Sequence, residues 1–426
     1  MPQIFALADV NAMYCACESV FDPRLRGRAV VVASNNDGCA VARNQQAKAL
    51  GVKMGQPIFE LKDLMENHGL VVCSSNYALY GDMSFRFMQV LAECAPRVIP
   101  YSIDEAFMDL TGINTVVSFE DFGVQVKAKV AQWTGLPICV GISTSPTLSK
   151  LANHGAKKYP ATKGVVDLTD RDRQRKLLSL VPVSEIWGIG SRISKRLEEL
   201  GIKNGLQLAD ADPKWIRKHF SVVVERTVRE LNGIPCHDDL LEVGAAKKQI
   251  LTSKSFGTPV TQLATMLAAV TTHATRAAEK LRGERREAGF LSVFMSTSRY
   301  ADGERYANQQ GLTLPFPTAD TREIVRHAVK LARTLWRDGY RYNKAGIMLS
   351  DFREPGACQS DFFNPIEDTD RAKGLMSTLD RINSISGKGS VKFGREFHKD
   401  RSWQMRRGNL SPAYTTRWAD IPVVKC

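Results

Sequence analysis

The sequence predicts a multidomain protein that combines α/β and α+β segments. A chain of 426 residues is long enough to form several separate cores. Over residues 1–169, apolar strand-like runs alternate with helical patterns. Residues 170–240 show helical patterns only, and residues 249–350 follow the order β-α-β-β-α-β. The three segments therefore differ in architecture.

An acidic doublet, Asp104 and Glu105, lies inside the apolar run from Val98 to Leu110. Side chains alternate across a strand, so the two carboxylates point to opposite faces unless the chain bends between them. A strand-turn-strand with the doublet at its corner would let both carboxylates reach one site. A hairpin with a solvated acidic tip fits the same residues, so the doublet alone leaves both interpretations open.

A second apolar strand, Ile4 to Asp9, also ends in a carboxylate. Carboxylates at the ends of buried strands are costly unless they are paired or bind a metal. Three oxygen ligands suit Mg²⁺, which favours a few carboxylates together with substrate phosphates. Asp9, Asp104 and Glu105 are therefore the candidate metal site.

The other elements before residue 170 follow from periodicity and from turn residues. A strand leads into a helix that starts near Asn11. A strong turn signal lies at Asn35–Gly38. Further strands are expected at Ala29–Ala33 and Pro137–Ile142, and further helices at Arg43–Leu50, Asn76–Glu93, Phe119–Trp133 and Thr147–Lys158.

Composition favours a cytoplasmic protein that binds a polyanion. No run of 18 apolar residues exists, so no membrane span is predicted, and no basic amphipathic helix stands beside an apolar anchor, so no membrane partner is expected. The N-terminus lacks a basic region followed by an apolar one, so no secretory signal is expected. The nine cysteines show no paired CxxC spacing that would suggest zinc. Residues 1–240 hold 28 Lys and Arg against 26 Asp and Glu, whereas residues 241–426 hold 30 against 19. An excess of positive charge in the C-terminal part is typical of a grip on nucleic acid, although charge for solubility is the alternative.

A Gly-Ile-Gly turn, Gly188 to Gly190, runs into a helix expected at Ser191–Leu200. Such a turn bares backbone N–H groups that bind a phosphate without reading sequence. A plain tight turn is the other interpretation, and no strand–GxGxxG–helix unit surrounds it. Lys195 and the later Leu-Gly-Ile resemble a helix-hairpin-helix, which favours DNA contact.

After a polar linker, Pro235 to Lys248, the β-α-β-β-α-β segment carries basic strand tips, including Lys254 and Arg299. Its elements are expected at Ile250–Phe256, Val260–Arg282, Gly289–Thr297, Gly311–Leu314, Asp320–Arg337 and Lys344–Leu349. A Pro- and Gly-bearing link then leads to Gln359–Phe363. Residues 371–426 are basic, and their pattern does not assign a fold.

Four motifs, in this order and spacing, resemble the Y-family translesion DNA polymerases. They are Asp9–Tyr14, Ser102–Ala106, Gly141–Ser143 with Lys150 and Lys157, and Trp187–Gly190. The resemblance extends over essentially the whole chain. The tail is similar to that of the UmuC catalytic subunit of DNA polymerase V and its plasmid-borne relatives.

The resemblance implies a right-hand polymerase. The palm would be residues 1–20 and 80–169, the fingers 21–79, and the thumb with its helix-hairpin-helix 170–240. The little finger would be residues 241–350, the linker with a clamp-binding peptide 351–370, and a UmuC-type C-terminal region 371–426.

The resemblance also implies error-prone, template-directed DNA synthesis across lesions in the SOS response to DNA damage. Two Mg²⁺ ions, with Mn²⁺ a possible substitute, would serve nucleotidyl transfer. Asp9 and Asp104 would bridge the ions, Glu105 would hold the ion at the 3′-hydroxyl, and the Val10 carbonyl would complete the nucleotide-side site.

Lys48 and Lys157 would neutralise the triphosphate, with Arg43 a weaker candidate and a solvated helix face the alternative for each. Gln45 stands where many members have Tyr, and Lys48 replaces a frequent Arg. These departures concern the grip on the nucleotide and not the reaction.

Tyr14 matches the family's steric gate, a ring that leaves no room for a 2′-hydroxyl. The alternative is that Tyr14 is an aromatic residue of the core. Met13, which also belongs to the nucleotide-binding set, stands where Phe is common. Small side chains at Gly38–Ala40 would leave space for damaged templates.

The partners implied are primer–template DNA, deoxynucleoside triphosphates, the sliding clamp, a cleaved UmuD-type dimer and RecA. The clamp would dock on Gln359, Phe362 and Phe363. Two other classes remain open: a non-catalytic DNA-binding scaffold and an untemplated nucleotidyl transferase or cyclase. All three carboxylates argue against the first, and the basic C-terminal half argues against the second.

Overall fold

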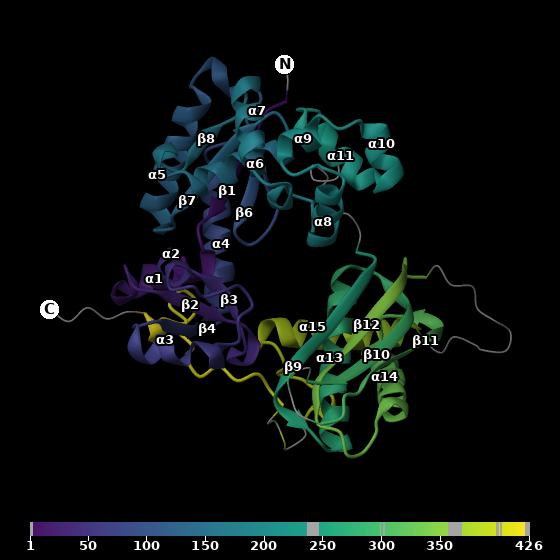
Figure 1. The fold of residues 1–426 in the computed structure, drawn as a ribbon. Helices are drawn as coiled ribbons and strands as arrows, with labels where there is room; N and C mark the ends of the chain where they lie inside the picture. Colours follow the sequence, from purple (N-terminus) through teal and green to yellow (C-terminus); the bar gives the residue numbers. More distant parts are fainter. Residues whose placement is uncertain are drawn as a thin grey trace. The chain divides into compact units, whose positions relative to one another are not determined.

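A computed structural model describes residues 3–236, 247–298, 300, 303–356, 369–397, 400 and 403–421. The chain forms two compact units (Figure 1). The first unit is Met1–Ala245 together with Gly408–Cys426, and the second is Ala246–Arg407. The mixed α/β and α+β fold class predicted from the sequence is confirmed.

The first unit is built on a five-stranded sheet of order β5-β6-β1-β7-β8. Its strands are β1 (Phe5–Val10), β5 (Arg97–Pro100), β6 (Glu105–Asp109), β7 (Ile138–Ser143) and β8 (Val165–Asp167). Strand β1 runs antiparallel to both of its neighbours, and β8 runs parallel to β7. Every residue of β1 is buried, which explains why its sequence reads as a continuous apolar run.

The predicted strand-turn-strand is confirmed. Strands β5 and β6 form an antiparallel hairpin, and Asp104 lies in its turn directly before Glu105, the first residue of β6. In the register of β1 with β6, Asp9 lies opposite Glu105. The hairpin therefore brings the acidic doublet to the carboxylate end of β1.

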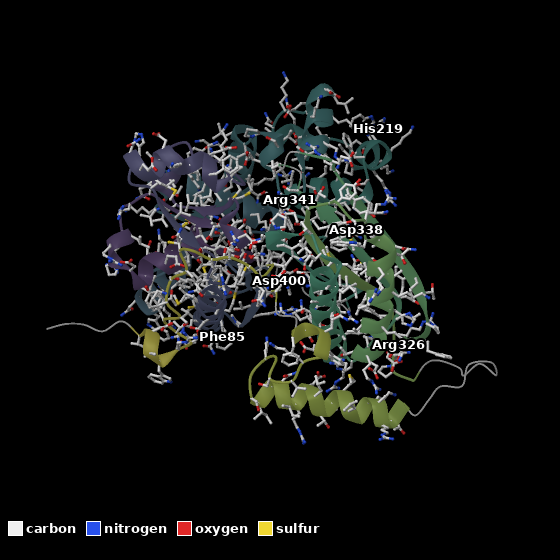
Figure 2. All side chains as sticks on the ribbon, turned by 90° about the horizontal axis from the view of Figure 1, so that it is seen from below. Phe85, His219, Arg326, Asp338, Arg341 and Asp400 are labelled. Atoms are coloured by element: carbon white, nitrogen blue, oxygen red, sulfur yellow. The ribbon has the colours of Figure 1, made fainter. Side chains whose placement is uncertain are left out.

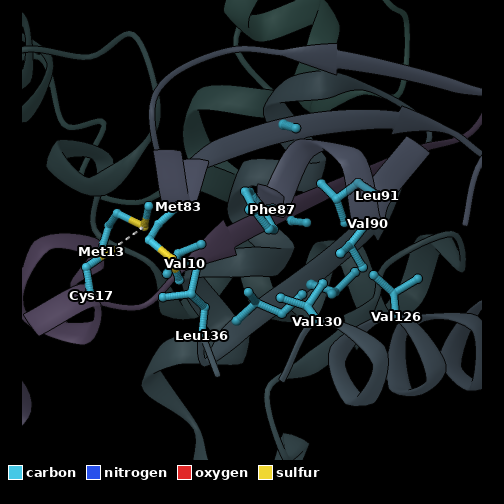
Figure 3. Packing of buried hydrophobic residues seen from close by; sticks show 14 of the residues in the cluster. Val10, Met13, Cys17, Met83, Phe87, Val90, Leu91, Val126, Val130 and Leu136 are labelled. Carbon is cyan, nitrogen blue, oxygen red and sulfur yellow. Dashed lines mark hydrogen bonds between the residues drawn. The ribbon is translucent and has the colours of Figure 1, made fainter. Parts of the chain in front are cut away.

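Helices pack on both faces of this sheet. On one face, Ala6, Ala8 and Val10 of β1 share a core with α4 (Tyr77–Ala92) and α5 (Phe119–Thr134). Figure 3 shows this core, in which Met13 packs beside Met83. The other face of β1 carries Asp9 and meets α6 (Pro146–Lys158).

A glycine allows α6 to lie unusually close to the sheet. A Cβ at Gly141 of β7 would lie 2.2 Å from the backbone nitrogen of Asn153 and 2.4 Å from the carbonyl oxygen of Ser149. The Ser149 hydroxyl donates to the carbonyl of Phe5 on β1 at 2.9 Å. This contact fixes α6, which carries Lys150 and Lys157, over the acidic end of the sheet.

Residues 21–79 contain a small sheet of order β3-β2-β4. Its strands are β2 (Val30–Ala33), β3 (Ala40–Arg43) and β4 (Val71–Ser74), and the helices here and just before it are α1 (Met13–Phe21), η1 (Pro23–Leu25), η2 (Asn35–Asp37), α2 (Gln45–Ala49), η3 (Ile58–Leu61) and α3 (Lys62–Asn67). The helix predicted from Arg43 begins instead at Gln45, because the Asn44 side chain caps it by accepting from the Ala47 N–H at 3.0 Å. Arg43 is the last residue of β3.

The described part of residues 170–240 is helical, as predicted. It comprises α7 (Arg171–Leu180), η6 (Val183–Glu185), α8 (Ser191–Glu199), α9 (Gly205–Ala209), α10 (Pro213–His219) and α11 (Val222–Leu231). The first unit also contains the short 3₁₀ helices η4 (Ile113–Thr115) and η5 (Pro160–Thr162), which precede this helical part in the sequence. A further 3₁₀ helix, η8 (Trp418–Asp420), lies in the C-terminal segment that belongs to the first unit.

The second unit has a four-stranded sheet of order β11-β10-β12-β9, antiparallel throughout. Its elements are β9 (Gln249–Val260), α13 (Leu263–Gly283), β10 (Glu287–Thr297), β11 (Ala307–Thr318), α14 (Thr321–Leu335), β12 (Tyr342–Arg353), α15 (Thr369–Ile385) and η7 (Gly394–Phe397). The predicted β-α-β-β-α-β order is confirmed. The two long helices cover one face of the sheet, and the outer side of α14 carries Arg326, whose side chain is exposed (Figure 2). Among the described residues, no helix is long and apolar enough to span a bilayer.

Candidate active site

Two carboxylates from neighbouring strands form the centre of the site, and each is paired with a lysine of α6. The Lys157 ammonium lies 2.6 Å from Asp9 Oδ1, and the Lys150 ammonium lies 2.9 Å from Glu105 Oε2. The side chain of Asp9 is only 9% exposed. The close approach of α6 at Gly141 is what brings both lysines within reach.

The two carboxylates hold their protons very differently. Burial, opposed by Lys157 and reinforced by the hydrogen bond with Glu105, raises the pKa of Asp9 to about 7. Burial alone would raise the pKa of Glu105 too, but its hydrogen bonds with Asp9 and Lys150 hold that pKa below its usual value. Near neutral pH, Asp9 is therefore partly protonated while Glu105 is ionised.

This difference predicts a pH-dependent effect of Asp9→Asn on stability. The usual pKa of an aspartate is 3.8, whereas the pKa of Asp9 in the folded protein is about 7. The free energy of unfolding therefore falls as pH rises between these two values. The amide does not titrate. In EDTA, the free energy of unfolding of Asp9→Asn, taken relative to that of the wild type, should rise between pH 5 and pH 8 by on the order of 2 kcal/mol.

Thermal unfolding at each pH checks this, with Asp109→Asn at the far end of β6 as the matched control. If the difference in thermal midpoint between Asp9→Asn and the wild type stayed constant across this pH range, the raised pKa of Asp9 would be contradicted.

Asp104 is close to this pair but points elsewhere. Its backbone carbonyl accepts from the Val10 N–H at 2.9 Å, and its carboxylate accepts a hydrogen bond from the Ser102 hydroxyl. Among the described residues, no three acidic, histidine or cysteine side chains lie close enough together to hold a metal ion. The structure therefore brings together the side chains of Asp9 and Glu105, whereas the carboxylate of the adjacent Asp104 is bound by Ser102.

Lys150 is held by aromatic rings as well as by Glu105. Its ammonium lies 4.4 Å from the ring centroid of Tyr101 and 5.2 Å from that of Trp187. The rings of Tyr101 and Trp187 themselves meet edge to face at 5.9 Å. This cation–π cage joins the Trp187 turn to the acidic hairpin. No local sequence pattern predicts this cage, because the three residues come from separate elements.

A basic cavity of about 940 Å³ lies beside the acidic pair, between α1, α2 and α6. Lys48 and Lys157, both predicted to bind a triphosphate, line it together with Gln45. Arg43 does not line it, because its guanidinium donates to the Val52 carbonyl. Sequence reasoning missed three further cationic side chains of the lining, Arg26, Lys127 and Lys163.

Tyr14 is part of an aromatic cluster at the start of α1. Its ring stacks on that of Tyr80 at a centroid distance of 4.3 Å and meets Tyr77 edge to face at 6.2 Å. Burial, then Tyr77 and Asp104, raise the pKa of Tyr14, so its hydroxyl stays protonated. Met13, by contrast, is buried in the core, with its sulfur 3.8 Å from that of Cys17, and only its backbone is available to a nucleotide.

The Gly-Ile-Gly turn leaves the N-terminus of α8 open. Gly190 is the N-cap, no side chain caps the helix, and a Cβ at Gly190 would meet nothing within 4 Å. Gly188 has a φ of 88°, which favours glycine. Lys195 is exposed one turn along the helix. The geometry suits a phosphate at the free N–H groups.

In the second unit, Lys254 shares the strand face of Ile250 and Phe256, which is covered by α13. Burial, together with Arg276 and Arg407, lowers its pKa. The open face of the sheet instead presents Lys344, which sequence reasoning missed; its ammonium lies 6.0 Å from the Phe294 ring centroid. Arg299 and the clamp residues Gln359, Phe362 and Phe363 lie outside the described residues.

The chain resembles known DNA polymerases. A solved Y-family DNA polymerase chimera shares the fold, with a TM-score of 0.64 and 20% identity, covering 82% of this chain and 99% of its own. A DNA polymerase IV of Pelotomaculum thermopropionicum is 27% identical over 90% of this chain and 93% of its own.

More similar relatives fix the family. Residues 8–154 match the impB/mucB/samB family, residues 247–362 match the C-terminal domain of that family, and residues 373–424 match a domain of unknown function. Proteins UmuC and SamB of Salmonella typhimurium are 49% and 50% identical, each over 99% of this chain and 100% of the relative. The chain therefore belongs to the impB/mucB/samB family, and it has the fold of the solved Y-family DNA polymerase chimera.

Proposed function

We propose that the protein copies damaged DNA during the SOS response, by template-directed nucleotidyl transfer at the end of β1. The observation that carries this proposal is the pairing of Asp9 and Glu105, opposite one another in the β-sheet and beside a basic cavity large enough for a nucleotide. The names of the relatives support the translesion role.

The donor set fits magnesium, with manganese as a substitute. Carboxylate oxygens are the ligands that Mg²⁺ prefers, and the register of β1 with β6 places the carboxylate residues Asp9 and Glu105 opposite one another. Asp9, Asp104, Glu105 and the Val10 carbonyl would hold the ions. When bound, two ions would stabilise the attacking and leaving oxygens of the transfer.

The lysines have the complementary role. Lys157 bridges the acidic pair and the basic cavity, because it contacts Asp9 and lines the cavity as well. With Lys48 it would bind the triphosphate, while Tyr14 would lie under the sugar. Lys150, caged by aromatic rings, would hold Glu105 in place.

The remaining segments would have the roles of a right hand. Residues 1–20 and 80–169 would form the palm, 21–79 the fingers, 170–240 the thumb and 241–350 the little finger. The thumb would bind a phosphate at the N-terminus of α8, and the little finger would contact DNA through the open sheet face that carries Lys344. A cleaved UmuD-type dimer and RecA would be partners in the cell.

Primer extension on an undamaged template and on the same template with one abasic site tests the translesion role. The proposal expects extension on both, with synthesis continuing past the lesion. Extension on the undamaged template that always stops at the lesion would refute it.

Replacing Tyr14 with alanine should relax sugar discrimination while incorporation of deoxynucleotides continues. The expected loss of selectivity is roughly a hundredfold, because a steric clash rather than a hydrogen bond excludes the 2′-hydroxyl. Single-nucleotide incorporation of matched ribo- and deoxyribonucleotides measures the ratio. Phe85→Ala, which removes an exposed ring of α4, is the control. Unchanged selectivity in Tyr14→Ala would return this residue to a purely packing role.

The stretch Gln359–Phe363 is proposed to dock on the sliding clamp. Short peptides of this kind take most of their binding energy from one or two aromatic anchors. The triple variant Gln359→Ala, Phe362→Ala, Phe363→Ala should therefore lose clamp binding and clamp-stimulated synthesis. Extension without the clamp should stay near the wild-type rate. Clamp affinity equal to that of the wild type would exclude this peptide.

A further inference from the structure

The C-terminal segment 408–421, hereafter the strap, returns to the first unit and pairs with it through backbone and side-chain contacts. The Ser74 N–H at the end of β4 donates to the Asn409 carbonyl at 2.8 Å, and the Asn409 N–H donates to the Ser74 hydroxyl at 3.0 Å. Further along, the ring of Tyr414 stacks on Phe21 of α1 at 5.0 Å. The strap is therefore fastened to both β4 and α1.

Asn76 joins the strap to the start of α4. Its side-chain oxygen Oδ1 caps that helix by accepting from the Leu79 N–H at 3.3 Å. Its amide nitrogen donates to the Ser411 hydroxyl at 3.0 Å and to the Pro412 carbonyl at 3.2 Å. The first turn of α4, which carries Tyr77 and Tyr80, is thus attached directly to the strap.

Glu18 of α1 is the buried group on which these contacts converge. It is 2% exposed, and within the described residues no lysine or arginine pairs with it. Its carboxylate accepts from the Tyr80 hydroxyl at 2.6 Å and from the Ser411 hydroxyl at 3.1 Å. A buried carboxylate is costly unless it is hydrogen-bonded, so both donors are needed to keep it in place. Burial raises the pKa of Glu18, and the two donors oppose that rise.

Tyr80 connects Glu18 to Tyr14, the proposed sugar gate. It is fully buried, its hydroxyl is held by Glu18, and its ring stacks on that of Tyr14 at 4.3 Å with an interplanar angle of 13°. A stacked partner restricts where a ring can lie. The orientation of Tyr14 therefore depends on a continuous chain of contacts that begins at Ser411 in the strap.

We propose that Ser411, Glu18 and Tyr80 are positioning residues for Tyr14, so that the strap contributes to the selection of deoxyribonucleotides over ribonucleotides. This inference rests on the proposed role of Tyr14 as the sugar gate. It assigns a function to part of a region whose matching family model carries none. Loosening the strap lets the Tyr14 ring move, and a ring that moves excludes the 2′-hydroxyl less completely.

Single-turnover incorporation of one matched deoxynucleotide and one matched ribonucleotide by the full chain tests the proposal. Ser411→Ala removes the strap donor, and Tyr80→Phe removes the other hydroxyl but keeps the stacked ring. Each should lower selectivity about three- to tenfold, the effect of one typical intramolecular hydrogen bond. Thr416→Ala, which removes an exposed strap hydroxyl, should leave selectivity unchanged. Thermal unfolding confirms that each variant is folded under assay conditions.

Combination with Tyr14→Ala separates this inference from the gate itself. If Ser411 acts through Tyr14, then Ser411→Ala should have no further effect on selectivity in the Tyr14→Ala background. Wild-type selectivity in both Ser411→Ala and Tyr80→Phe, with selectivity lost in Tyr14→Ala, would overturn the role of the strap and leave the gate intact. Wild-type selectivity in Tyr14→Ala would overturn the gate and this inference together.

Discussion

Asp104→Asn or Glu105→Gln is expected to lower the rate of primer extension by about a thousandfold or more while leaving primer–template binding near the wild-type level. Loss of one charged ligand should remove several kcal/mol of transition-state stabilisation, and about 4 kcal/mol corresponds to a thousandfold. Both substitutions keep the shape of the side chain, so the hairpin that holds them should persist. Single-turnover kinetics measures the rate, and fluorescence anisotropy measures DNA binding.

Asp109→Asn is the matched control, because Asp109 ends the same strand at a distance from the site. It should extend primers at the wild-type rate. Near wild-type extension by either Asp104→Asn or Glu105→Gln would show that the acidic doublet does not hold the catalytic ions.

The second large effect is expected from Gly141→Ala. The added Cβ would lie 2.2 Å and 2.4 Å from backbone atoms of α6, which cannot move aside as a flexible side chain could. The helix must retreat from the sheet, which should cost about 3 kcal/mol or more. Because α6 carries Lys150 and Lys157, extension should also fall in the fraction that remains folded.

Gly283→Ala is the control for this substitution, since a Cβ there would meet nothing within 4 Å. Its thermal midpoint should stay at or above that of the wild type. A thermal midpoint for Gly141→Ala equal to that of Gly283→Ala would contradict the close contact between α6 and β7.

The acidic hairpin could be predicted because its signal is local. Apolar runs on either side of Asp104 and Glu105 fix the strands, and two adjacent carboxylates can share a site only at a corner. The same holds for the second unit, where strand and helix patterns alternate cleanly. Its β11 nevertheless extends over Ala307–Thr318, well beyond the predicted Gly311–Leu314, because polar residues are common in a strand with an exposed face.

The contacts that complete the site are long-range, and periodicity does not carry them. Lys150 meets Glu105 across 45 residues, and Ser411 meets Glu18 across 393 residues. Helical and strand patterns also misplaced two basic residues. Arg43 ends a strand and faces Val52, while Lys254 shares a strand face with core residues. The direction in which a side chain points depends on where a helix is capped and on the register of a strand. The hydrophobic pattern alone determines neither.

We propose that the protein copies a template with the acidic pair at its catalytic centre. The most direct measurement is incorporation of single nucleotides on four templates that differ only in the coding base, with Mg²⁺ and with EDTA, by wild type and Glu105→Gln. The wild type with Mg²⁺ should favour the complementary nucleotide on each template, and EDTA or the substitution should abolish incorporation. Incorporation that ignores the template base, or that persists in Glu105→Gln, would contradict it.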